Sequence, residues 1–553
     1  MYIQLPNRFS TFCMLAVPLL LFYPVILGDS RVMGAPISDM SNGLWSLWHF
    51  SNAILSGSDP LCTSLINAPN DGCLVPADWT GLIWMIPLSM VLEPIQAFNT
   101  TLYLQVVWIG MCMYLLHQAW FKAEKPVSNK YESALLSAIL LQVSTVVRTG
   151  LHNGSTEVLS LGWVLLGLVG WNQVLAGYRW AWLLILPVIG TSWYGVVGFV
   201  LIAAVQWMSR RVSLSKGSLC CGAAVSSVWA IFVYWVYTLS SGTGNLLRIK
   251  GSAEMDSVRR TIGSADPLTY VVPWSYTSPD FSEVSRFGEQ FVHSSYIGWV
   301  ILGTCLWYTK SALRHWSIWA AGLGFLLSLG PVLVLEAEPL LIFGLGIPLP
   351  YILLESLPLF DHLTLLYRLS WVPIVCVTGF AVHHWKSRWV VLCAAAIAET
   401  LFVSPVRTLP TCTDLSFVQQ VRSIKDTPEG IVGLYPLAGG RPYMASQIWH
   451  EKPLATTLNF PANEASLHVL QTIRNNESVE DKVFQTRVLE IAKSRGIRYW
   501  IVDADGSMMP DEYHKGVHRL RDAFPVLLTV EQSLQDSTEC SSVWDSLYIV
   551  RLW

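Results

Sequence analysis

Long apolar runs separated by short polar segments dominate the chain. They recur near residues 9–27, 80–93, 101–118, 132–147, 158–176, 181–208, 218–239, 295–308, 315–335, 339–354, 369–384 and 388–404. Runs of this composition predict membrane helices, although several are too short to cross a bilayer by themselves. The pattern predicts an α-helical polytopic membrane protein with roughly 11 membrane segments, counting re-entrant and interfacial helices.

Two of these runs need a closer interpretation. The first follows Arg8, as in a signal peptide, but the residues before Asp29 lack the small-x-small pattern of a cleavage site, so we expect an uncleaved helix. Pro187, Gly190 and Gly195 interrupt the run near 181–208, which favours a broken or hairpin pair of helices over one long span.

Positive charge in the short connecting loops predicts the orientation. Four basic clusters should lie in the cytoplasm: Lys122, Lys125 and Lys130; Arg210, Arg211 and Lys216; Lys310 and Arg314; Lys386 and Arg388. With the N-terminus inside, residues 28–79, 148–157, 240–294 and 331–368 then lie outside. The count requires residues 79–90, which are few and include Pro87, to form an interfacial or re-entrant helix.

The pattern changes after about residue 405. Charges become frequent, and short β-rich runs (431–435, 497–503, 526–530 and 547–552) alternate with helical ones such as 479–494. We therefore divide the chain into a membrane domain, residues 1–404, and a soluble extracytoplasmic α/β domain, residues 405–553. No nucleotide-type Gly-rich loop opens a helix in the second domain, so we assign it no catalysis.

The composition argues against two broad classes of protein. With 52% hydrophobic and 13% charged residues, the chain is too apolar for an ordinary soluble protein, and 26 tryptophans suit many membrane-interface positions. The net charge of −3 and the lack of a basic patch argue against nucleic acid as a partner, because nothing would neutralise a phosphate backbone.

The first outer loop, residues 28–79, concentrates acidic residues. It holds Asp29, Asp39, Asp59, Asp71 and Asp78 but a single basic residue, Arg31. Residues 39–56 have an amphipathic pattern between Ser38, a good N-cap, and Gly57, a typical helix stop. They predict a helix lying on the outer membrane surface.

One stripe of this helix is polar. Asp39, Asn42, Ser46 and His49 recur three and four residues apart and therefore point the same way. The helix dipole favours an ionised Asp39, which can accept a proton from a hydroxyl or bind a hard cation. Asn42 and His49 are then candidates for contacting a substrate. The plainer alternative is that Asp39 only stabilises the first turn of its helix.

Glu157 is the second acidic candidate. It follows His152-Asn153-Gly154 at the predicted outer end of a helix, and Asn153 is a further candidate for substrate contact. Asp39 and Glu157 together suit an acid/base pair or a site for a divalent cation, Mg²⁺ or Mn²⁺. An acid that merely begins a helix is again the alternative.

Basic groups on the outer side are candidates for binding a phosphate. Arg248, Arg259 and Arg260 in loop 240–294 can clamp a lipid head group, with simple solvation as the alternative. Arg368 lies where a helix re-enters the membrane, and can meet lipid phosphates generally or one bound substrate. His293, just before a predicted helix, counts among the substrate-binding candidates as a hydrogen-bonding residue rather than a metal ligand.

The cysteines bear on the orientation. Seven lie within or at the ends of apolar runs, and the other four are Cys62 and Cys73 in the first loop and Cys412 and Cys540 in the terminal domain. The first outer loop and the terminal domain, both predicted to be outside, thus hold two each. Because disulfides persist only in oxidising compartments, this distribution favours disulfide bonding of these four. Unrelated free thiols are the alternative.

The arrangement resembles the GT-C superfamily of membrane glycosyltransferases. Ser38-Asp39-Met40 with Leu44-Trp45, then Gly57-Ser58-Asp59-Pro60-Leu61 and Asn70-Asp71-Gly72, are similar to uncharacterised bacterial multi-pass proteins of the YfhO-like GT-C group. The resemblance covers most of the membrane part and, more weakly, residues 496–502.

The resemblance implies transfer of a sugar from a polyprenyl-phosphate carrier on the outer face, with an acid of the first loop as base or metal ligand. Asp39 matches that acid, and Glu157 stands where many members place a second one. The chain lacks the doubled acidic motif of well-studied branches, so it departs from their metal-binding pattern. The implied partners are membrane lipid, the lipid-linked sugar and a glycan or lipid acceptor of the cell envelope, at a bacterial plasma (inner) membrane.

Two other functions remain open. A lipid or glycan transporter or flippase would need ionisable groups inside the apolar runs, where few occur, and no inverted pair of halves is evident. A non-catalytic envelope-glycan assembly protein would use the terminal domain to recognise its glycan.

Overall fold

A computed structural model of the chain describes most of the residues. The described ranges are 5–26, 30–35, 38–66, 68, 72–73, 78–121, 130–242, 260, 263–272, 295–335, 338–355, 360, 363–385, 389–400, 412–415, 420–435, 440–455, 471–472, 480–503, 520, 522–531, 541–542 and 546–552. Arg248, Arg259, His293 and Cys540 lie outside these ranges, so the expectations placed on them stay predictions.

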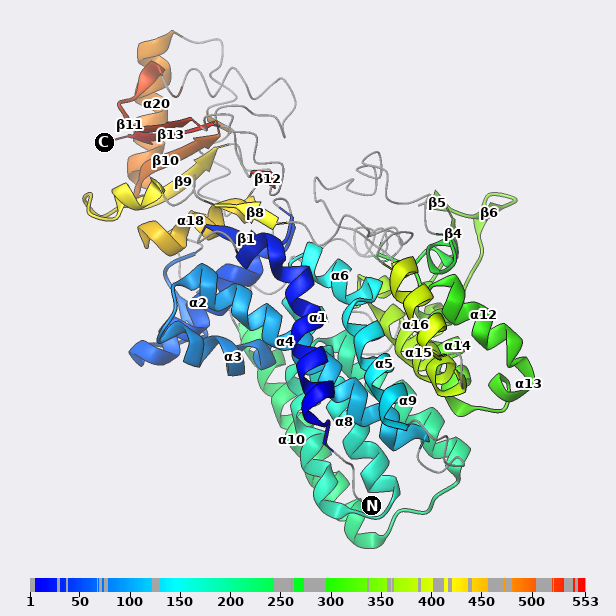
Figure 1. Cartoon of the computed structure of the whole chain (residues 1–553). Helices are drawn as coiled ribbons and strands as arrows, with labels where there is room; N and C mark the ends of the chain where they lie inside the picture. The colour runs from blue at the N-terminus through cyan, green and yellow to red at the C-terminus, as the bar shows by residue number, and fades with distance from the viewer. Residues whose placement is uncertain are drawn as a thin grey trace.

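Residues up to 400 form a bundle of helices with short outer elements (Figure 1). Its α-helices are α1 (Arg8–Ile26), α2 (Met40–Ser56), α3 (Trp79–Ser89), α4 (Pro94–Phe121), α5 (Lys130–Gln142), α6 (Thr145–His152), α7 (Thr156–Leu159), α8 (Leu161–Leu175), α9 (Trp193–Arg210), α10 (Lys216–Gly242), α12 (Trp299–Trp307), α13 (Thr309–Ala312), α14 (Trp316–Ser328), α15 (Trp371–His384) and α16 (Trp389–Ala398).

Several helices of the bundle suit a membrane. Among the described residues, five helical segments are long and apolar enough to cross one: Pro94–Phe121, Tyr131–His152, Thr156–Leu175, Lys216–Trp235 and Leu366–His384. Shorter apolar helices include Trp79–Ser89, close to the predicted interfacial segment, and Trp316–Ser328. These helices support a membrane location, while the total of roughly 11 segments stays a prediction.

The long run near residue 181 is broken, as predicted. Two short 3₁₀ helices, η1 (Arg179–Leu184) and η2 (Leu186–Gly190), precede α9. Pro187 lies at the start of η2, and the Ser192 hydroxyl accepts a hydrogen bond of 3.1 Å from the Gly195 N–H to cap α9. The chain therefore turns before α9 instead of continuing one helix.

Residues 339–354, an apolar run within the segment that we expect to lie outside, form no α-helix. These residues form β5 (Glu338–Pro339), β6 (Leu341–Ile342), β7 (Leu345–Gly346) and the 3₁₀ turn η5 (Pro350–Leu353). Phe343 and Gly344 have φ of 52° and 78°, the left-handed values that reverse the chain between β6 and β7. Apolarity without a helical period did not distinguish a hairpin from a helix.

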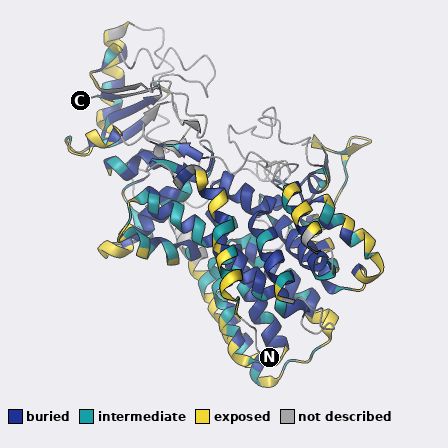
Figure 2. Cartoon of the chain, viewed as in Figure 1, coloured by how far each residue is buried: buried dark blue, intermediate teal, exposed yellow. Residues whose placement is uncertain are grey.

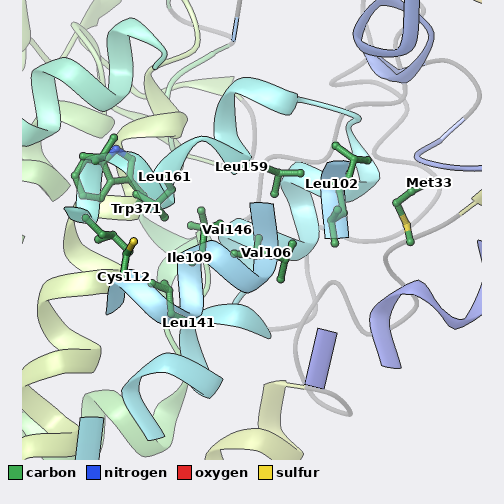
Figure 3. Close-up of a cluster of buried hydrophobic side chains, with 14 of the residues drawn as sticks. Met33, Leu102, Val106, Ile109, Cys112, Leu141, Val146, Leu159, Leu161 and Trp371 are labelled. Carbon is green, nitrogen blue, oxygen red and sulfur yellow. The ribbon is translucent and has the colours of Figure 1, made fainter. Parts of the chain in front are cut away.

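Buried apolar side chains from distant parts of the chain meet in one cluster (Figure 3). The labelled members include Leu102, Val106 and Ile109 on α4, Leu141 on α5, Val146 on α6, Trp371 on α15 and Met33 on β1 (Arg31–Met33). Burying each such side chain contributes roughly 1.5–3 kcal/mol. Figure 2 shows buried residues in the middle of the bundle and exposed ones along α10 and around α12 and α13.

The C-terminal region contains a small sheet with strand order β11–β13–β10–β9. The strands β9 (Ile431–Tyr435), β10 (Ile497–Asp503), β11 (Val526–Glu531) and β13 (Ser546–Arg551) match the predicted runs closely, as does helix α20 (Asp481–Ser494). β10 pairs parallel with β9 and antiparallel with β13. Phe484 and Val488 of α20 pack with Trp500 of β10 in a separate apolar cluster.

The first outer loop and the C-terminal region are built together. β1 pairs antiparallel with β8 (Cys412–Asp414), and α18 (Gly440–His450) packs on α2 (Figure 1). The Trp45 indole N–H of α2 donates a 2.5 Å hydrogen bond to Oε1 of Gln447 on α18. The segment around Asp39 is thus held in place by contacts with the C-terminal region as well as with its own neighbours in the sequence.

The described cysteines divide into two groups. Cys62 and Cys412 each take part in a disulfide. Cys62 lies opposite Cys73 where β2 (Cys62–Thr63) pairs with β3 (Gly72–Cys73). The seven cysteines of the apolar runs are free: Cys13, Cys112, Cys220, Cys221, Cys305, Cys376 and Cys393.

Candidate functional site

The start of α2 is seated on the turn that follows α6. The Asp39 N–H donates to the Asn153 carbonyl at 3.0 Å, and the Ala35 N–H donates to the His152 carbonyl at 2.8 Å. Gly154 has φ 61°, and a Cβ there would overlap the Met40 backbone. Only glycine therefore allows this close approach, which brings Asp39 beside residues 153–157.

Asp39 occupies the N-cap position of α2, one residue later than the predicted cap, Ser38. Its φ is −69°, and its side chain makes no capping hydrogen bond. The Ser38 hydroxyl accepts from the Met40 N–H at 3.2 Å instead. The Asp39 carboxylate therefore does not cap the N-terminus of its own helix.

Arg368 links both predicted acids. It lies in the 3₁₀ turn η6 (Leu366–Ser370), which leads into α15. Its guanidinium contacts Asp39 Oδ2 at 3.5 Å, donates to Glu157 Oε1, and donates to the Ser155 hydroxyl at 3.2 Å. The structure thus gathers Asp39, Glu157 and Arg368 from three separate parts of the sequence, and we call them the acid–arginine cluster.

The three side chains of the acid–arginine cluster differ in exposure. Arg368 is 7% exposed, Glu157 14% and Asp39 24%. A guanidinium keeps its charge in such a setting, and its planar fork suits carboxylate or phosphate oxygens. Asp39, with the longer contact and the greater exposure, is the carboxylate more accessible to another molecule.

Two tyrosines that the sequence analysis did not single out support Arg368. The guanidinium lies 5.7 Å from the centroid of the Tyr194 ring, and the Tyr194 hydroxyl accepts hydrogen bonds from the N–H groups of Thr364 and Leu365. The Asn153 amide donates to the Tyr367 hydroxyl at 3.4 Å. Tyr367 directly precedes Arg368 in the sequence, whereas nothing in the sequence marks Tyr194.

Asp78 is a buried acid near the same site. Its Oδ1 accepts from the N–H groups of Thr80 and Gly81, which caps α3, and its Oδ2 accepts from Gln105 at 2.7 Å. Burial raises the pKa of this carboxyl to about 6, opposed by these hydrogen bonds and assisted slightly by the charge of Glu157. Asp78 is thus a structural cap whose charge is coupled to the acid–arginine cluster.

The structure does not bring His49 to the cluster. Its ring stacks on Trp45 with centroids 5.0 Å apart, and burial lowers its pKa, with Pro60 and Asp59 as its polar neighbours. Ten residues of helix separate it from Asp39, a rise of about 15 Å. Asp39 and His49 therefore lie on the same face of the helix but do not belong to the same site. Asn42, one turn after Asp39, is half-buried.

Arg260 has a different partner. Its guanidinium pairs with Glu355 at 2.5 Å, and the residue is buried. The contact joins loop 240–294 to the segment before η6. Arg260 therefore ties two outer segments together in the structure, and its predicted contact with a lipid phosphate stays a prediction.

A divalent cation fits the acid–arginine cluster poorly as it stands. Mg²⁺ and Mn²⁺ prefer about six oxygen ligands, and the Arg368 guanidinium already contacts both carboxylates. Across the described ranges, no group of three His, Cys, Asp or Glu side chains has an arrangement that holds a metal. The predicted cation remains a prediction, and the chemistry proposed below does not depend on it.

Comparisons with known proteins bear on the fold. Neither the protein-family models nor the curated proteins contain a match. Among solved structures, the arabinofuranosyltransferase AftD from Mycobacteria is similar, with a TM-score of 0.50 and 14% identity over 99% of this chain. The Archaeoglobus fulgidus oligosaccharyltransferase has a TM-score of 0.47 and 10% identity, covering 98% of this chain and 76% of that chain.

The chain spans 40% of the length of AftD. At 14% identity, the likeness concerns the fold and not the activity. The chain shares the fold of this membrane glycosyltransferase structure.

Proposed function

We propose that the protein is an integral membrane glycosyltransferase. It moves a sugar from a polyprenyl-phosphate carrier to a hydroxyl of a cell-envelope acceptor on the outer face of the membrane. The observation that carries the proposal is the convergence of Asp39, Glu157 and Arg368 in a GT-C fold. A carboxylate can accept the proton that the acceptor hydroxyl loses. The neighbouring arginine can stabilise the polyprenyl phosphate that leaves the donor.

Asp39 acts as the general base in this proposal. Its carboxylate takes the proton of the acceptor hydroxyl while the hydroxyl oxygen bonds to C1 of the donor sugar. The bond between C1 and the phosphate oxygen breaks, and its electron pair leaves with the polyprenyl phosphate. Asp39 suits this role because it is the most exposed acid of the cluster and makes the longer contact with Arg368.

Arg368 stabilises the leaving phosphate. Phosphate oxygens compete with Asp39 for the guanidinium, so donor binding frees the Asp39 carboxylate to receive a proton. Glu157 keeps Arg368 oriented through its own hydrogen bond and helps retain the charge in a largely buried position. The ion pair between Arg368 and Asp39 thereby links binding of the donor to activation of Asp39 as the base.

Further parts of the proposal follow from the resemblance. The region after residue 405 lies outside the cytoplasm of a bacterial plasma membrane, and the acceptor is a glycan or lipid. The narrower likeness to YfhO-like proteins stays a prediction. A requirement for Mg²⁺ or Mn²⁺ is tested by adding EDTA to the transfer assay and then restoring each cation.

Two features of the described residues argue against the transporter and the assembly protein. Buried amides of α8 and α9 pair with each other, Gln206 donating to Asn172 Oδ1 at 2.7 Å, and provide no ionisable path there. The acid–arginine cluster is largely buried rather than spread over a solvent-facing surface.

The test uses purified full-length protein in nanodiscs with labelled sugars carried on polyprenyl phosphate or on a nucleotide. Release of polyprenyl phosphate is measured with and without a panel of envelope glycans, so that an unknown acceptor does not hide donor cleavage. We expect release from at least one polyprenyl-phosphate sugar and none from nucleotide sugars. Use of nucleotide sugars only, or no release from any lipid-linked donor, contradicts the proposal.

A further inference from the structure

The β6–β7 hairpin presents apolar side chains to its surroundings. Leu341 pairs with Gly346 and Ile342 with Leu345, around the turn at Phe343 and Gly344. The exposed fractions are 59% for Leu341, 51% for Ile342, 100% for Phe343 and 74% for Leu345. Four large apolar side chains at one tip are unusual for a surface in contact with water.

Paired backbone holds this tip outward. The Leu340 N–H donates to Leu333 O at 2.8 Å, the Leu333 N–H donates to Ile347 O at 3.1 Å, and the Leu349 N–H donates to Pro331 O at 2.8 Å. The hairpin is therefore built on the 331–335 segment and does not fold back onto the bundle. Phe343 keeps a positive φ, which is costly for a bulky residue, at the point farthest along the turn.

The hairpin lies at the end of the bundle that holds the acid–arginine cluster. It follows α14, whose Ser328 carbonyl accepts from the Ala265 N–H at 2.8 Å. Nearby, the Gly263 carbonyl accepts from the N–H of Tyr367, the neighbour of Arg368, at 2.8 Å. Figure 1 shows β6 projecting from the edge of the bundle beyond α12 and α14.

The lipid-facing surface of the bundle leads to the hairpin. Trp319, Leu323 and Leu326 of α14 are exposed and spaced three and four apart, so they form one apolar stripe that ascends toward residue 328. No charged residue occurs from Leu340 to Leu354, which includes the exposed Leu353 of η5. The hairpin thus matches the apolar surface of this membrane helix, with the exposed Glu338 of β5 at its base.

We propose that the β6–β7 hairpin inserts its tip into the outer leaflet of the membrane. The leaflet covers the apolar side chains that the protein itself leaves exposed, in the way that interfacial elements bind a bilayer. The interface of a protein partner typically has a polar rim, whereas the tip and the stretch 340–354 around it carry no charged side chain. This inference does not depend on the proposed transferase activity.

The test measures the depth of a fluorophore in the bilayer. Phe343→Cys and Leu345→Cys are each labelled with NBD in a Cys220→Ser, Cys221→Ser background, since Cys220 is the exposed free cysteine among those the structure describes. Glu490→Cys, at an exposed position of α20, is the matched control. The full-length protein is reconstituted in nanodiscs with or without lipids carrying a doxyl quencher on the acyl chain.

We expect the labels at 343 and 345 to emit at shorter wavelength and to be quenched at least about threefold more than the label at 490. Both sites are at an exposed turn, so the melting temperature of the labelled protein should equal that of its parent. Quenching at 343 and 345 no greater than at 490 overturns the proposal, and would leave a protein partner as the occupant of the tip.

Discussion

The guanidinium of Arg368 donates a hydrogen bond to the Glu157 carboxylate, although 211 positions separate the two residues in the sequence. The pair joins the turn before α8 to the turn before α15, and the contact of Arg368 with Asp39 adds the first turn of α2. The buried ion pair thus fixes the relative positions of three segments that carry the proposed chemistry.

Breaking this pair from one side should destabilise the protein. Arg368→Gln leaves a largely buried Glu157 carboxylate without its cation, and we expect the free energy of unfolding to fall by about 2–4 kcal/mol. Glu157→Gln should cost less, because Arg368 keeps Asp39. The measurement is thermal or denaturant unfolding in detergent micelles. In the Arg368→Gln, Glu157→Gln double variant, the loss of stability should differ from the sum of the two single losses by about 1–3 kcal/mol. A loss equal to that sum would show that the ion pair contributes nothing.

Gly154 should be indispensable for the geometry of the site. Gly154→Ala adds a Cβ that overlaps the Met40 backbone and disfavours a φ of 61°, so α2 must shift away from the turn. We expect more than about 2 kcal/mol of destabilisation and loss of most transfer activity. Gly57→Ala is the matched control, because its φ is 72° but its Cβ would meet no atom within 4 Å. It should cost about 1 kcal/mol. Equal effects at both positions would refute the role given to this close approach.

Stability should depend on pH through Asp78. The pKa of its carboxyl rises from an ordinary 3.8 to about 6 because of burial, so the folded protein binds a proton more tightly than the unfolded chain. The contribution is fully present below about pH 4 and is lost as pH rises through about 6, up to about 3 kcal/mol in all.

The comparison with Asp78→Asn isolates this contribution. Asparagine keeps an oxygen for the N–H groups of Thr80 and Gly81 but carries no charge. The stability of the wild type relative to the variant should therefore fall between pH 4 and pH 7, as read from melting temperatures at each pH. A difference that stays constant over this range would contradict the assignment.

The contact between α2 and α18 should hold the first outer loop to the C-terminal region. Gln447→Leu removes the acceptor of the Trp45 N–H and the donor to the Lys452 carbonyl, all in a fully buried setting. We expect a loss of about 2–3 kcal/mol and faster proteolysis of the outer regions. Gln485→Leu, on the exposed face of α20, should change stability by less than about 1 kcal/mol. Identical proteolysis of the two variants would argue against this coupling.

The sequence predicted the local elements better than the contacts between them. The apolar periodicity and the caps predicted α2 within one residue, and β-rich alternation predicted β9 and β10. Asp39 and Glu157 were recognisable because acids at helix starts on one side of a membrane are few. Arg368, which contacts both acids, could not be identified in the same way. The choice between Arg260 and Arg368 as their partner depends on how distant helices pack.

Two features of the structure have physical causes that the sequence only partly reveals. His49 shares a helical face with Asp39 but lies too far along the helix to share its site, so periodicity was satisfied without proximity. The apolar run at 339–354 contains Gly344, Pro348 and Pro350, which are turn signals that could have indicated a hairpin. The proposed insertion of this hairpin explains why its composition resembles that of a membrane helix.

The most direct test of the central claim is the rate of polyprenyl-phosphate release by wild type, Asp39→Asn and Asp59→Asn in nanodiscs. Asp59 is an exposed acid of the same loop, and asparagine there keeps an oxygen for the Leu61 N–H. The account predicts a loss of at least about 100-fold for Asp39→Asn and a change within about twofold for Asp59→Asn. Equal rates for wild type and Asp39→Asn, with both variants folded, would contradict it.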